Sequence, residues 1–387
     1  MIDIYDPEQY GDGPPHAVFE QLRRTDPVHR QEMPDGTFYW AVMRHADVVE
    51  VSRNPNLYSA ARGGVVLEDL APDSLAMMQD MLLAMDPPRH AEHRDSLSAH
   101  FRARVIANLE PSIRRICGEI IDAAGEGDIE VVHDVCAHVP AQVIGELVGI
   151  PESDRDQIHS WAEHIVSGAD DSLNGSIAMA MYAMELAATR RGEPREDLIT
   201  LLLDAEFDGE PMTDLAFGSF FVQLVVAGND TSRTMLSSAI LALLQHPDQL
   251  AELREDRTLL AGTTEEVLRW SNPLHYFRRT ASEDAVLGGQ AIAEGEKLAM
   301  MYTSANRDEA VFEDPHSFDI HRSPNPHLSF GIGEHFCLGV HLARLEGRVF
   351  IDEMLNRWSS IELAGDPVRQ RSNLNNSMVS LPLTVRR

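Results

Sequence analysis

Lysine is almost absent from this chain of 387 residues, in which Lys297 is the single lysine. Acidic residues outnumber lysine and arginine by 62 to 32, so the formal net charge is −30 at pH 7. A surface of that sign repels nucleic acid and anionic membranes, which argues against both as partners. Any local basic patch that binds a partner must therefore be built from arginine.

Long apolar runs are also missing, although 43% of the residues are hydrophobic. No stretch approaches the roughly 20 apolar residues that a membrane-spanning helix needs. The first residues, Met1 to Tyr10, are acidic and polar, unlike a secretory signal or a membrane anchor. We therefore expect a soluble, cytoplasmic protein of bacterial type that does not bind membranes.

Cysteine is scarce as well. Cys117, Cys136 and Cys337 match no zinc or iron–sulfur spacing, and an odd number argues against a disulfide framework. Cys117 and Cys136 lie in stretches with helical apolar periodicity, so we expect them to be small core residues. Cys337 has a different setting, on which the functional argument depends.

Helical periodicity dominates the rest of the chain. Helices are predicted over residues 111–124, 141–148, 154–166, 177–189 and 214–245, and short strands over 38–42, 65–67, 284–287 and 379–385. No internal repeat or long linker divides the sequence. These patterns predict a mainly α fold with small β-sheets, organised as a single domain over residues 1–387.

The segment from Phe330 to Gly339 reads Phe-Gly-Ile-Gly-Glu-His-Phe-Cys-Leu-Gly. Gly331 and Gly333 permit a tight turn with positive φ just before Cys337. Apolar residues follow at helical spacing, which predicts Cys337 at a helix N-terminus: Leu338, Leu342, Leu345 and Val349. Free N–H groups and the helix dipole favour a thiolate there, and a thiolate is a suitable axial ligand for haem iron.

This segment resembles the haem-binding signature of the cytochrome P450 family, with every fixed position filled. The resemblance runs through nearly the whole chain and implies the P450 fold, enclosing haem b with Cys337 as the iron ligand. It also implies haem contacts from Phe330, Gly331, His335 and Gly339. The competing interpretation is a glycine-rich turn that leads a buried free cysteine into a helix.

Residues 227–231, Ala-Gly-Asn-Asp-Thr, interrupt the apolar face of the longest predicted helix. The Thr231 hydroxyl can bond the carbonyl of Ala227, and Gly228 leaves room for a diatomic ligand. The segment resembles the oxygen-activation motif of the family. The resemblance implies that Thr231 stabilises activated oxygen, that Asp230 delivers protons through water, and that Ala227 and Gly228 line the haem. The competing interpretation is a helix-packing site with a solvated Asp230.

Haem carries two propionates, so the resemblance implies cations at its rim. Residues 86–94 match a family pattern, with His90 and Arg94 on one face of a helix that starts after two prolines. His335 and Arg279 match the other usual propionate contacts.

Two neighbouring residues receive other assignments. Arg278 is expected to be solvated. His93 could bind a metal together with His90, but no third ligand follows at a suitable spacing.

Glu266 and Arg269 match the Glu-x-x-Arg pair of the family, and Arg322 matches its third member. The resemblance implies a buried structural triad. Thr263-Thr-Glu-Glu266 also fits a helix-capping box, which would leave Arg269 free. We favour the triad because Arg322 stands where the family pattern requires it.

The resemblance also predicts a substrate pocket with mainly apolar walls, which suits a lipophilic ligand. Gln223 and His275 are its polar exceptions, and both residue types are more often structural than substrate-binding. The residues assigned to the pocket are Leu82, Leu83, Gln223, Val226, Leu274, His275 and Met378.

Together these features predict a haem-thiolate monooxygenase that hydroxylates or epoxidises a lipophilic molecule such as a terpenoid, steroid, branched lipid or secondary metabolite. O2 would be the co-substrate. Electrons from NAD(P)H would pass through a ferredoxin reductase and a ferredoxin, which docks on a monomeric enzyme at Arg102, Arg104, Arg344 and Arg348. The alternatives are a haem-thiolate peroxygenase or isomerase, and a non-catalytic haem sensor.

Overall fold

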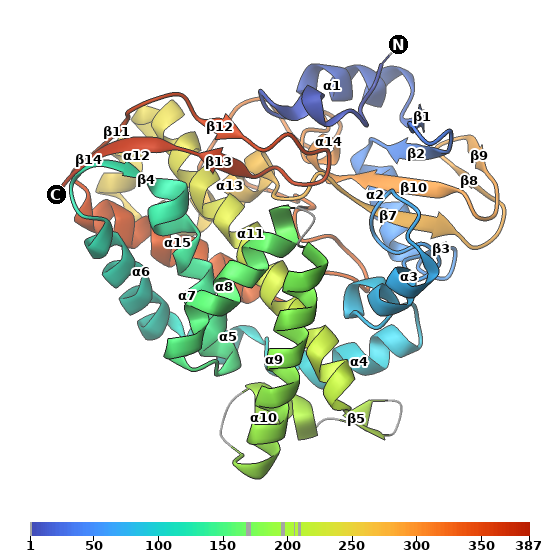
Figure 1. Cartoon of the computed structure of the whole chain (residues 1–387). Helices are drawn as coiled ribbons and strands as arrows, with labels where there is room; N and C mark the ends of the chain where they lie inside the picture. The colour runs from blue at the N-terminus through green and yellow to red at the C-terminus, as the bar shows by residue number, and fades with distance from the viewer. Residues whose placement is uncertain (1, 168–171, 195–197, 205, 208–209) are drawn as a thin grey trace.

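The computed structural model describes residues 2–167, 172–194, 198–204, 206–207 and 210–387 (Figure 1). Most of these residues lie in helices. The α-helices are α1 (His16–Thr25), α2 (His45–Arg53), α3 (Pro72–Gln79), α4 (Arg89–Ser98), α5 (Ala103–Ala107), α6 (Glu110–Ala124), α7 (His138–Val148), α8 (Glu152–Ser167), α9 (Ser172–Gly192), α10 (Leu198–Asp204), α11 (Asp214–Gln245), α12 (Pro247–Glu255), α13 (Leu260–Ser271), α14 (Tyr302–Ala305) and α15 (Val340–Arg357). Short 3-10 segments are η1 (Pro7–Tyr10), η2 (Leu82–Ala84) and η4 (Arg257–Leu259), and η3 (Val132–Cys136) is a π-helix.

The strands are short and form small sheets. They are β1 (Val28–Glu32), β2 (Phe38–Val42), β3 (Tyr58–Ser59), β4 (Gly127–Glu130), β5 (Glu206–Phe207), β6 (Glu210–Pro211), β7 (Tyr276–Ala281), β8 (Ala285–Leu287), β9 (Gln290–Ile292), β10 (Lys297–Met301), β11 (Ser360–Leu363), β12 (Val368–Arg369), β13 (Met378–Ser380) and β14 (Pro382–Arg386). The largest sheet has the order β1-β2-β10-β7-β3 and lies at one end of the molecule (Figure 1).

The observed ranges of the strongly periodic helices agree closely with the ranges predicted from the sequence. The predicted helix over 214–245 is α11, and the one over 111–124 is α6, which begins at Glu110. The predicted ranges 141–148, 154–166 and 177–189 lie within α7, α8 and α9. Their apolar faces are continuous over several turns, so the helical signal is strong.

The strands agree less well. Residues 65–67 are not a strand, and their contacts with the large sheet include a hydrogen bond from the N–H of Arg278 to the carbonyl of Val65. The predicted strand 379–385 is divided at Leu381 into β13 and β14. The strands that the sequence analysis missed include β10 and β7, and β7 was missed because it carries two adjacent arginines within an apolar run.

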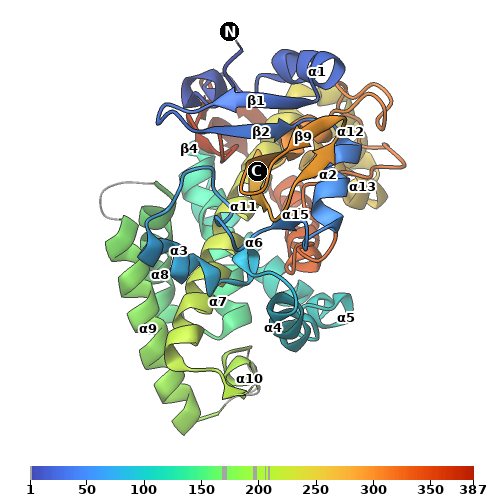
Figure 2. The same cartoon turned by 90° about the vertical axis from the view of Figure 1, so that its right-hand side faces the viewer.

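Helix α11 crosses the helical part of the molecule and organises its core (Figures 1 and 2). The Thr213 side chain caps its N-terminus by accepting a hydrogen bond from the N–H of Ala216. Helices α7, α9, α13 and α15 pack against it, and their apolar side chains form one large cluster with its own. Two smaller apolar clusters lie against the large sheet. No helix in the described part of the chain is long and apolar enough to cross a membrane.

Candidate functional site

The loop before α15 folds around two left-handed glycines. Gly331 has φ of 67° and Gly333 has φ of 77°, both of which disfavour a side chain. A Cβ on Gly333 would come within 2.6 Å of the carbonyl oxygen of Ser52, so this position also needs glycine for a close backbone approach. The turn is closed by a hydrogen bond of 2.8 Å from the N–H of Cys337 to the carbonyl of Phe330.

We expected Cys337 at the N-terminus of a helix, but it lies just before the helix begins. Helix α15 begins at Val340, with Gly339 as its N-cap, so the thiol precedes the first turn by three residues. Burial raises the pKa of the Cys337 thiol, while a hydrogen bond from the Gly339 N–H and the cation of Arg94 lower it. The local environment alone thus favours the thiol, and a bound metal cation would supply the remaining stabilisation of a thiolate.

Four cationic or ionisable side chains lie close together at this loop: His90, Arg94, Arg279 and His335. The rings of His90 and His335 lie 4.2 Å apart between centroids, and His90 is almost fully buried. Burial, reinforced by neighbouring arginines, lowers the pKa of His90 to about 4 and that of His335 to about 2. Both imidazoles are therefore neutral at physiological pH, and each can donate one N–H hydrogen bond, which His335 directs to the backbone of Met85.

These side chains lack protein partners at several atoms. Neither ring nitrogen of His90 has a hydrogen-bond partner, and neither does Nε2 of His335. Among the described residues, no carboxylate lies within ion-pair distance of Arg94 or Arg279. Buried polar atoms in proteins are normally satisfied, so this cluster is suited to an anionic ligand with several acceptor oxygens. The two propionates of haem fit that requirement, with Cys337 in position for the iron.

Helix α11 contributes the second half of the site. Ala227 is exposed and Thr231 is partly exposed in the middle of a helix that is otherwise mostly buried. The Thr231 hydroxyl donates a hydrogen bond of 2.6 Å to the carbonyl of Ala227, one turn earlier in the same helix. The Asp230 carboxylate pairs with Arg233, which follows three residues later. We did not predict a role for Arg233, although its i, i+3 spacing from Asp230 was a visible signal.

Gly228 lies where α11 packs against α7. A Cβ at this position would lie 3.0 Å from Cδ1 of Ile144 on α7, so the glycine allows the two helices to approach each other closely. Its expected role, leaving room for a diatomic ligand, stays a prediction.

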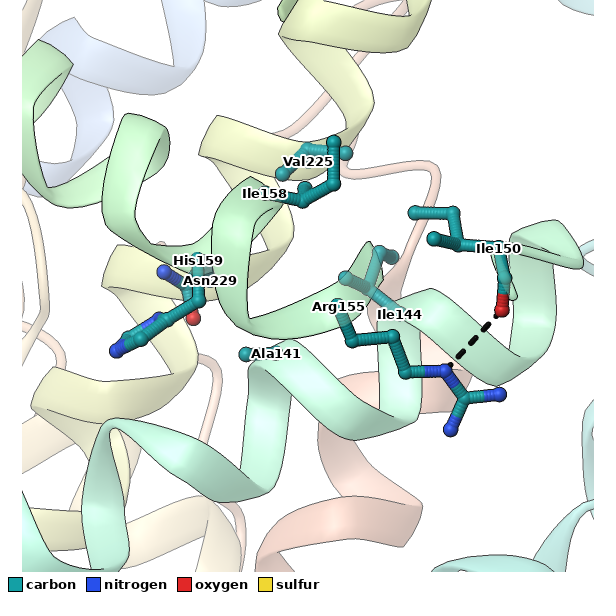
Figure 3. Close-up of a pocket in the computed structure, with 8 residues that line it drawn as sticks. All are labelled: Ala141, Ile144, Ile150, Arg155, Ile158, His159, Val225 and Asn229. Carbon is teal, nitrogen blue, oxygen red and sulfur yellow. Dashed lines mark hydrogen bonds between the residues drawn. The ribbon is translucent and has the colours of Figure 1, made fainter. Parts of the chain in front are cut away.

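A small cavity lies on this side of α11, between α7 and α8 (Figure 3). Its volume is about 10 Å³, which is the size of one water molecule. The side chains of His159 and Asn229 lie next to each other at one side of it, whereas Arg155 turns away to the carbonyl of Ile150 (Figure 3). The buried Oδ1 of Asn229 has no hydrogen-bond partner, which suits a bound water. This cavity is too small for a substrate.

A larger cavity of about 220 Å³ lies between α4, η2 and the start of α11. Its walls include Leu82, which we had assigned to the substrate pocket, and Phe220. Leu97 and Met212 add further apolar surface, and Arg89 contributes a polar edge. The cavity is large enough to accept part of a lipophilic molecule.

The polar residues assigned to the pocket have structural partners. Oε1 of Gln223 accepts a hydrogen bond of 2.8 Å from the N–H of Leu82, which joins α11 to η2. His275 is buried, shares a 2.9 Å hydrogen bond with the Thr303 hydroxyl and packs against the ring of Tyr10. This geometry favours the structural interpretation of both side chains over direct substrate binding.

The apolar pocket residues lie in several elements. Leu82 and Leu83 belong to η2, and Val226 belongs to α11 beside Ala227. Leu274 forms an isolated β-bridge with Asn375, and Met378 begins β13.

The Glu266 carboxylate accepts hydrogen bonds from both predicted partners. Arg269 reaches it at 2.7 and 2.8 Å, and Arg322 reaches it at 3.2 and 3.3 Å. Helix α13 begins at Leu260, and the Thr263 hydroxyl bonds the carbonyl of Leu259 within the helix, so the alternative capping box does not form. The triad ties α13 to the chain segment that precedes the cysteine loop.

Arg278 is buried rather than solvated. Its guanidinium forms an ion pair with Asp69 at 3.0 Å, and Lys297 reaches the same carboxylate at 2.8 Å. The prediction of a solvated Arg278 was wrong because β7 turns this side chain under the segment 65–69. The only lysine of the sequence, Lys297, therefore forms a structural ion pair.

The arginines expected to form a docking surface differ in their surroundings. Arg102 and Arg104 are exposed, and neither has an ion pair within the described part of the chain. Arg344 bonds Glu265 twice at 2.7 Å, and Arg348 reaches Glu110 at 3.2 Å. Only the first two therefore present uncompensated charge.

Comparison with known proteins decides the family. The family model described as Cytochrome P450 matches residues 153–385. This chain belongs to the cytochrome P450 family. The steroid C26-monooxygenase of Mycolicibacterium smegmatis is 37% identical to this P450 over 381 residues, which cover 94% of this chain and 89% of that protein. The methyl-branched lipid omega-hydroxylase of Mycobacterium bovis is 35% identical over 388 residues, which cover 95% of this chain and 90% of that protein.

Solved P450 structures have the same architecture. Mycobacterium marinum cytochrome P450 CYP268A2, in complex with pseudoionone, matches this P450 with a TM-score of 0.90 and 37% identity. The match covers 95% of this chain and 94% of that one. The predicted fold class, mainly α with small sheets in the P450 arrangement, is thus confirmed. The chain is a cytochrome P450 monooxygenase.

Proposed function

We propose that this P450 hydroxylates an unactivated C–H bond of a lipophilic molecule of the sterol or branched-lipid class. The names of its relatives support this class, because one is a steroid C26-monooxygenase and another is a methyl-branched lipid omega-hydroxylase. The apolar walls around Leu82 and Phe220 provide a second argument, since burying apolar surface contributes roughly 25 cal/mol per Å². We extend the proposal to the whole of residues 1–387 as one haem domain.

The observation that carries the proposal is that the Cys337 turn lies beside Arg94 and Arg279, neither of which forms an ion pair within the described part of the chain, and beside His90, whose ring nitrogens have no hydrogen-bond partner. We assign Cys337 as the iron ligand, and His90, Arg94, Arg279 and His335 as the propionate contacts. When bound, haem supplies the redox-active iron at which O2 is reduced. The backbone of Phe330, Gly331 and Gly339 holds the thiolate, because the turn and the Gly339 N–H position its sulfur.

Proton supply is assigned to α11. The reaction consumes protons, and the nearest side chains able to carry them are Asp230 and the Thr231 hydroxyl. The Thr231 hydroxyl is held against the carbonyl of Ala227, and Ala227 is exposed, so water can reach this segment. The ion pair with Arg233 holds the Asp230 carboxylate close to α11, where it can accept a proton.

Electron supply is assigned to an external partner. NAD(P)H would donate electrons through a ferredoxin reductase to a ferredoxin, which docks near Arg102 and Arg104. The strongly negative net charge opposes long-range attraction of an acidic ferredoxin, so short-range contacts with these arginines must orient it.

The test is the spectrum of the reduced protein under carbon monoxide. We expect the strongly red-shifted Soret band of thiolate ligation, and we expect Cys337→Ser to abolish it. Cys117→Ala is the matched control, because Cys117 is buried in α6 and its loss should leave the band unchanged. Retention of the band in the Cys337 variant would overturn the assignment.

A further inference from the structure

A buried arginine without a counter-charge lies just after α14, where α1 packs against that helix (Figure 1). Arg307 is 5% exposed, and no carboxylate in the described part of the chain forms an ion pair with it. One N–H of its guanidinium bonds the carbonyl of Trp270 at 3.2 Å, and its Cζ lies 3.7 Å from the centre of the Trp270 ring. Its buried Nε has no hydrogen-bond partner among the described residues. Buried polar groups are normally satisfied, so this cation calls for another ligand.

A second buried arginine, Arg23 on α1, meets the same piece of backbone. Its Nη1 donates a hydrogen bond of 3.1 Å to the carbonyl of Ser304, and the backbone N–H of Arg307 bonds that same carbonyl at 3.0 Å. Arg23 is 2% exposed, and its Nε pairs with Glu309 at 3.0 Å. Its Nη2 lacks a partner within the ranges that the structure describes. Each of the two guanidinium groups therefore brings one unsatisfied N–H to this junction.

Two histidines border the same junction. His16 begins α1 and lies seven residues before Arg23, which puts both side chains on one face of the helix. Nδ1 of His16 is buried and has no hydrogen-bond partner in the described structure. The ring of His316 lies 6.4 Å from that of His16 between centroids, and 44% of the His316 side chain is exposed. Burial, reinforced by the charge of Arg307, lowers the pKa of His16 well below its ordinary value, so its neutral ring can donate one N–H.

The carboxylates near the junction are already engaged by other cations. The two oxygens of Glu309 pair with Arg23 at 3.0 Å and with Arg24 at 2.8 Å. Those of Glu20 pair with Arg24 at 2.6 Å and with a neighbouring histidine at 3.4 Å. Arg307 is therefore left without a carboxylate of its own among the described residues.

Arg307 keeps its positive charge in this setting. Burial, reinforced by the neighbouring Arg269, lowers the pKa of its guanidinium to about 9, so it is still protonated at neutral pH. A buried cation without a partner is costly, and an anion would offset that cost through charge-assisted hydrogen bonds. The carboxylates of Glu20 and Glu309 repel a divalent anion more strongly than a monovalent one.

We propose that the junction of α1 and α14 binds a small monovalent inorganic anion such as chloride. Nε of Arg307, Nη2 of Arg23 and Nδ1 of His16 donate hydrogen bonds to it. The anion neutralises the surplus charge of Arg307 and so ties α1 to the segment after α14. Through the bond from Arg307 to the carbonyl of Trp270, it also supports the end of α13. The site uses none of the residues assigned to haem, oxygen or substrate, so it acts on stability and does not depend on the proposed function.

The test measures the melting temperature of the wild-type protein, with its haem, while chloride replaces gluconate at constant ionic strength. A ligand that binds only the folded state stabilises it progressively as its concentration rises above its dissociation constant. We therefore expect the melting temperature to rise by several degrees. Constant ionic strength keeps the screening of surface charges unchanged, so the rise reports binding.

Two variants and a control locate the effect. Arg307→Gln should abolish the dependence on chloride, because the surplus charge is removed. His16→Phe should weaken the apparent affinity for chloride several-fold, because it keeps a ring of similar size and removes one donor. It carries the comparison if Arg307→Gln does not fold. Arg371→Gln is the control and should retain the wild-type response, because Arg371 is exposed and pairs with Glu8.

Crystals of the wild-type protein soaked in bromide provide a direct measurement. We expect an anomalous bromide peak within hydrogen-bond distance of Arg23 and Arg307. A wild-type junction without bromide would overturn the site, and so would an equal response to chloride in wild type and His16→Phe. Absence of the carbon monoxide band from wild type would instead overturn the proposed function and leave the anion site unaffected.

Discussion

The carboxylate of Asp230 is bonded by the guanidinium of Arg233, one helical turn further along α11, at 2.5 Å. Both side chains are largely buried, so the pair is less screened by solvent than a surface ion pair. It restrains the side chain to which proton delivery is assigned.

Arg233→Gln should release this restraint and lower coupling, while Asp230→Asn should lower the rate of product formation by about 10²–10⁴-fold because the proton carrier is lost. Steady-state product and NAD(P)H consumption in H2O and D2O measure both effects. Arg191→Gln is the control, since Arg191 pairs with Asp214 at the far end of the same helix. Equal coupling in all three variants would remove Asp230 from the proton route.

Thr231→Ala should preserve haem content and substrate affinity while diverting reducing equivalents into peroxide. The reason is that the hydroxyl bonded to Ala227 is lost from the exposed face of α11. Peroxide release is measured beside product at saturating redox partner. Thr234→Ala is the matched control, because the Thr234 hydroxyl is buried against that of Ser377, 2.8 Å away. If both variants remain fully coupled, the peroxygenase alternative gains support.

Glu266→Gln should lower the free energy of unfolding by about 3–5 kcal/mol, because it leaves Arg269 and Arg322 buried near an uncharged group. Denaturant titration measures this loss. Glu265→Gln should cost about 1 kcal/mol or less, since that carboxylate is partly exposed where it meets Arg344. Equal losses in the two variants would argue against a buried triad as the main support of this segment.

Arg102→Glu and Arg104→Glu should slow reduction by ferredoxin without changing substrate affinity. Both side chains are exposed and unpaired in the described structure, so reversal of their charge acts on the partner. Stopped-flow reduction under carbon monoxide reports the rate. Salt should have a modest effect on wild type, since screening limits exposed charges to about 8 Å near physiological ionic strength.

Arg371→Glu provides the control for these charge reversals, because Arg371 is exposed near the N-terminal segment, where it pairs with Glu8. A loss at Arg371 with none at Arg102 and Arg104 would put the docking site on another face. Arg344→Glu is a weaker probe than its position suggests, since it also breaks the bond to Glu265.

The sequence by itself determined the parts of this protein that depend on neighbouring residues. The turn before Cys337 needs two glycines within three residues, and the Thr231 bond needs a carbonyl four residues earlier. The long helices likewise follow from apolar residues repeated over many turns, a signal that survives without knowledge of the fold. In these cases the spacing of residues along the chain directly determines the local conformation.

Only the tertiary structure decided the roles that depend on distant segments. Strand β10 pairs with β2 at Leu298 and Trp40, a contact that no local pattern specifies. The burial of Arg278 and the packing of Ile144 over Gly228 were decided in the same way. Glu346 on α15 is the clearest case: one helical residue among many in the sequence, it is 2% exposed in the folded protein, and this burial raises the pKa of its carboxyl to about 8. Desolvation depends on what surrounds a side chain in space, and the sequence around it does not contain that information.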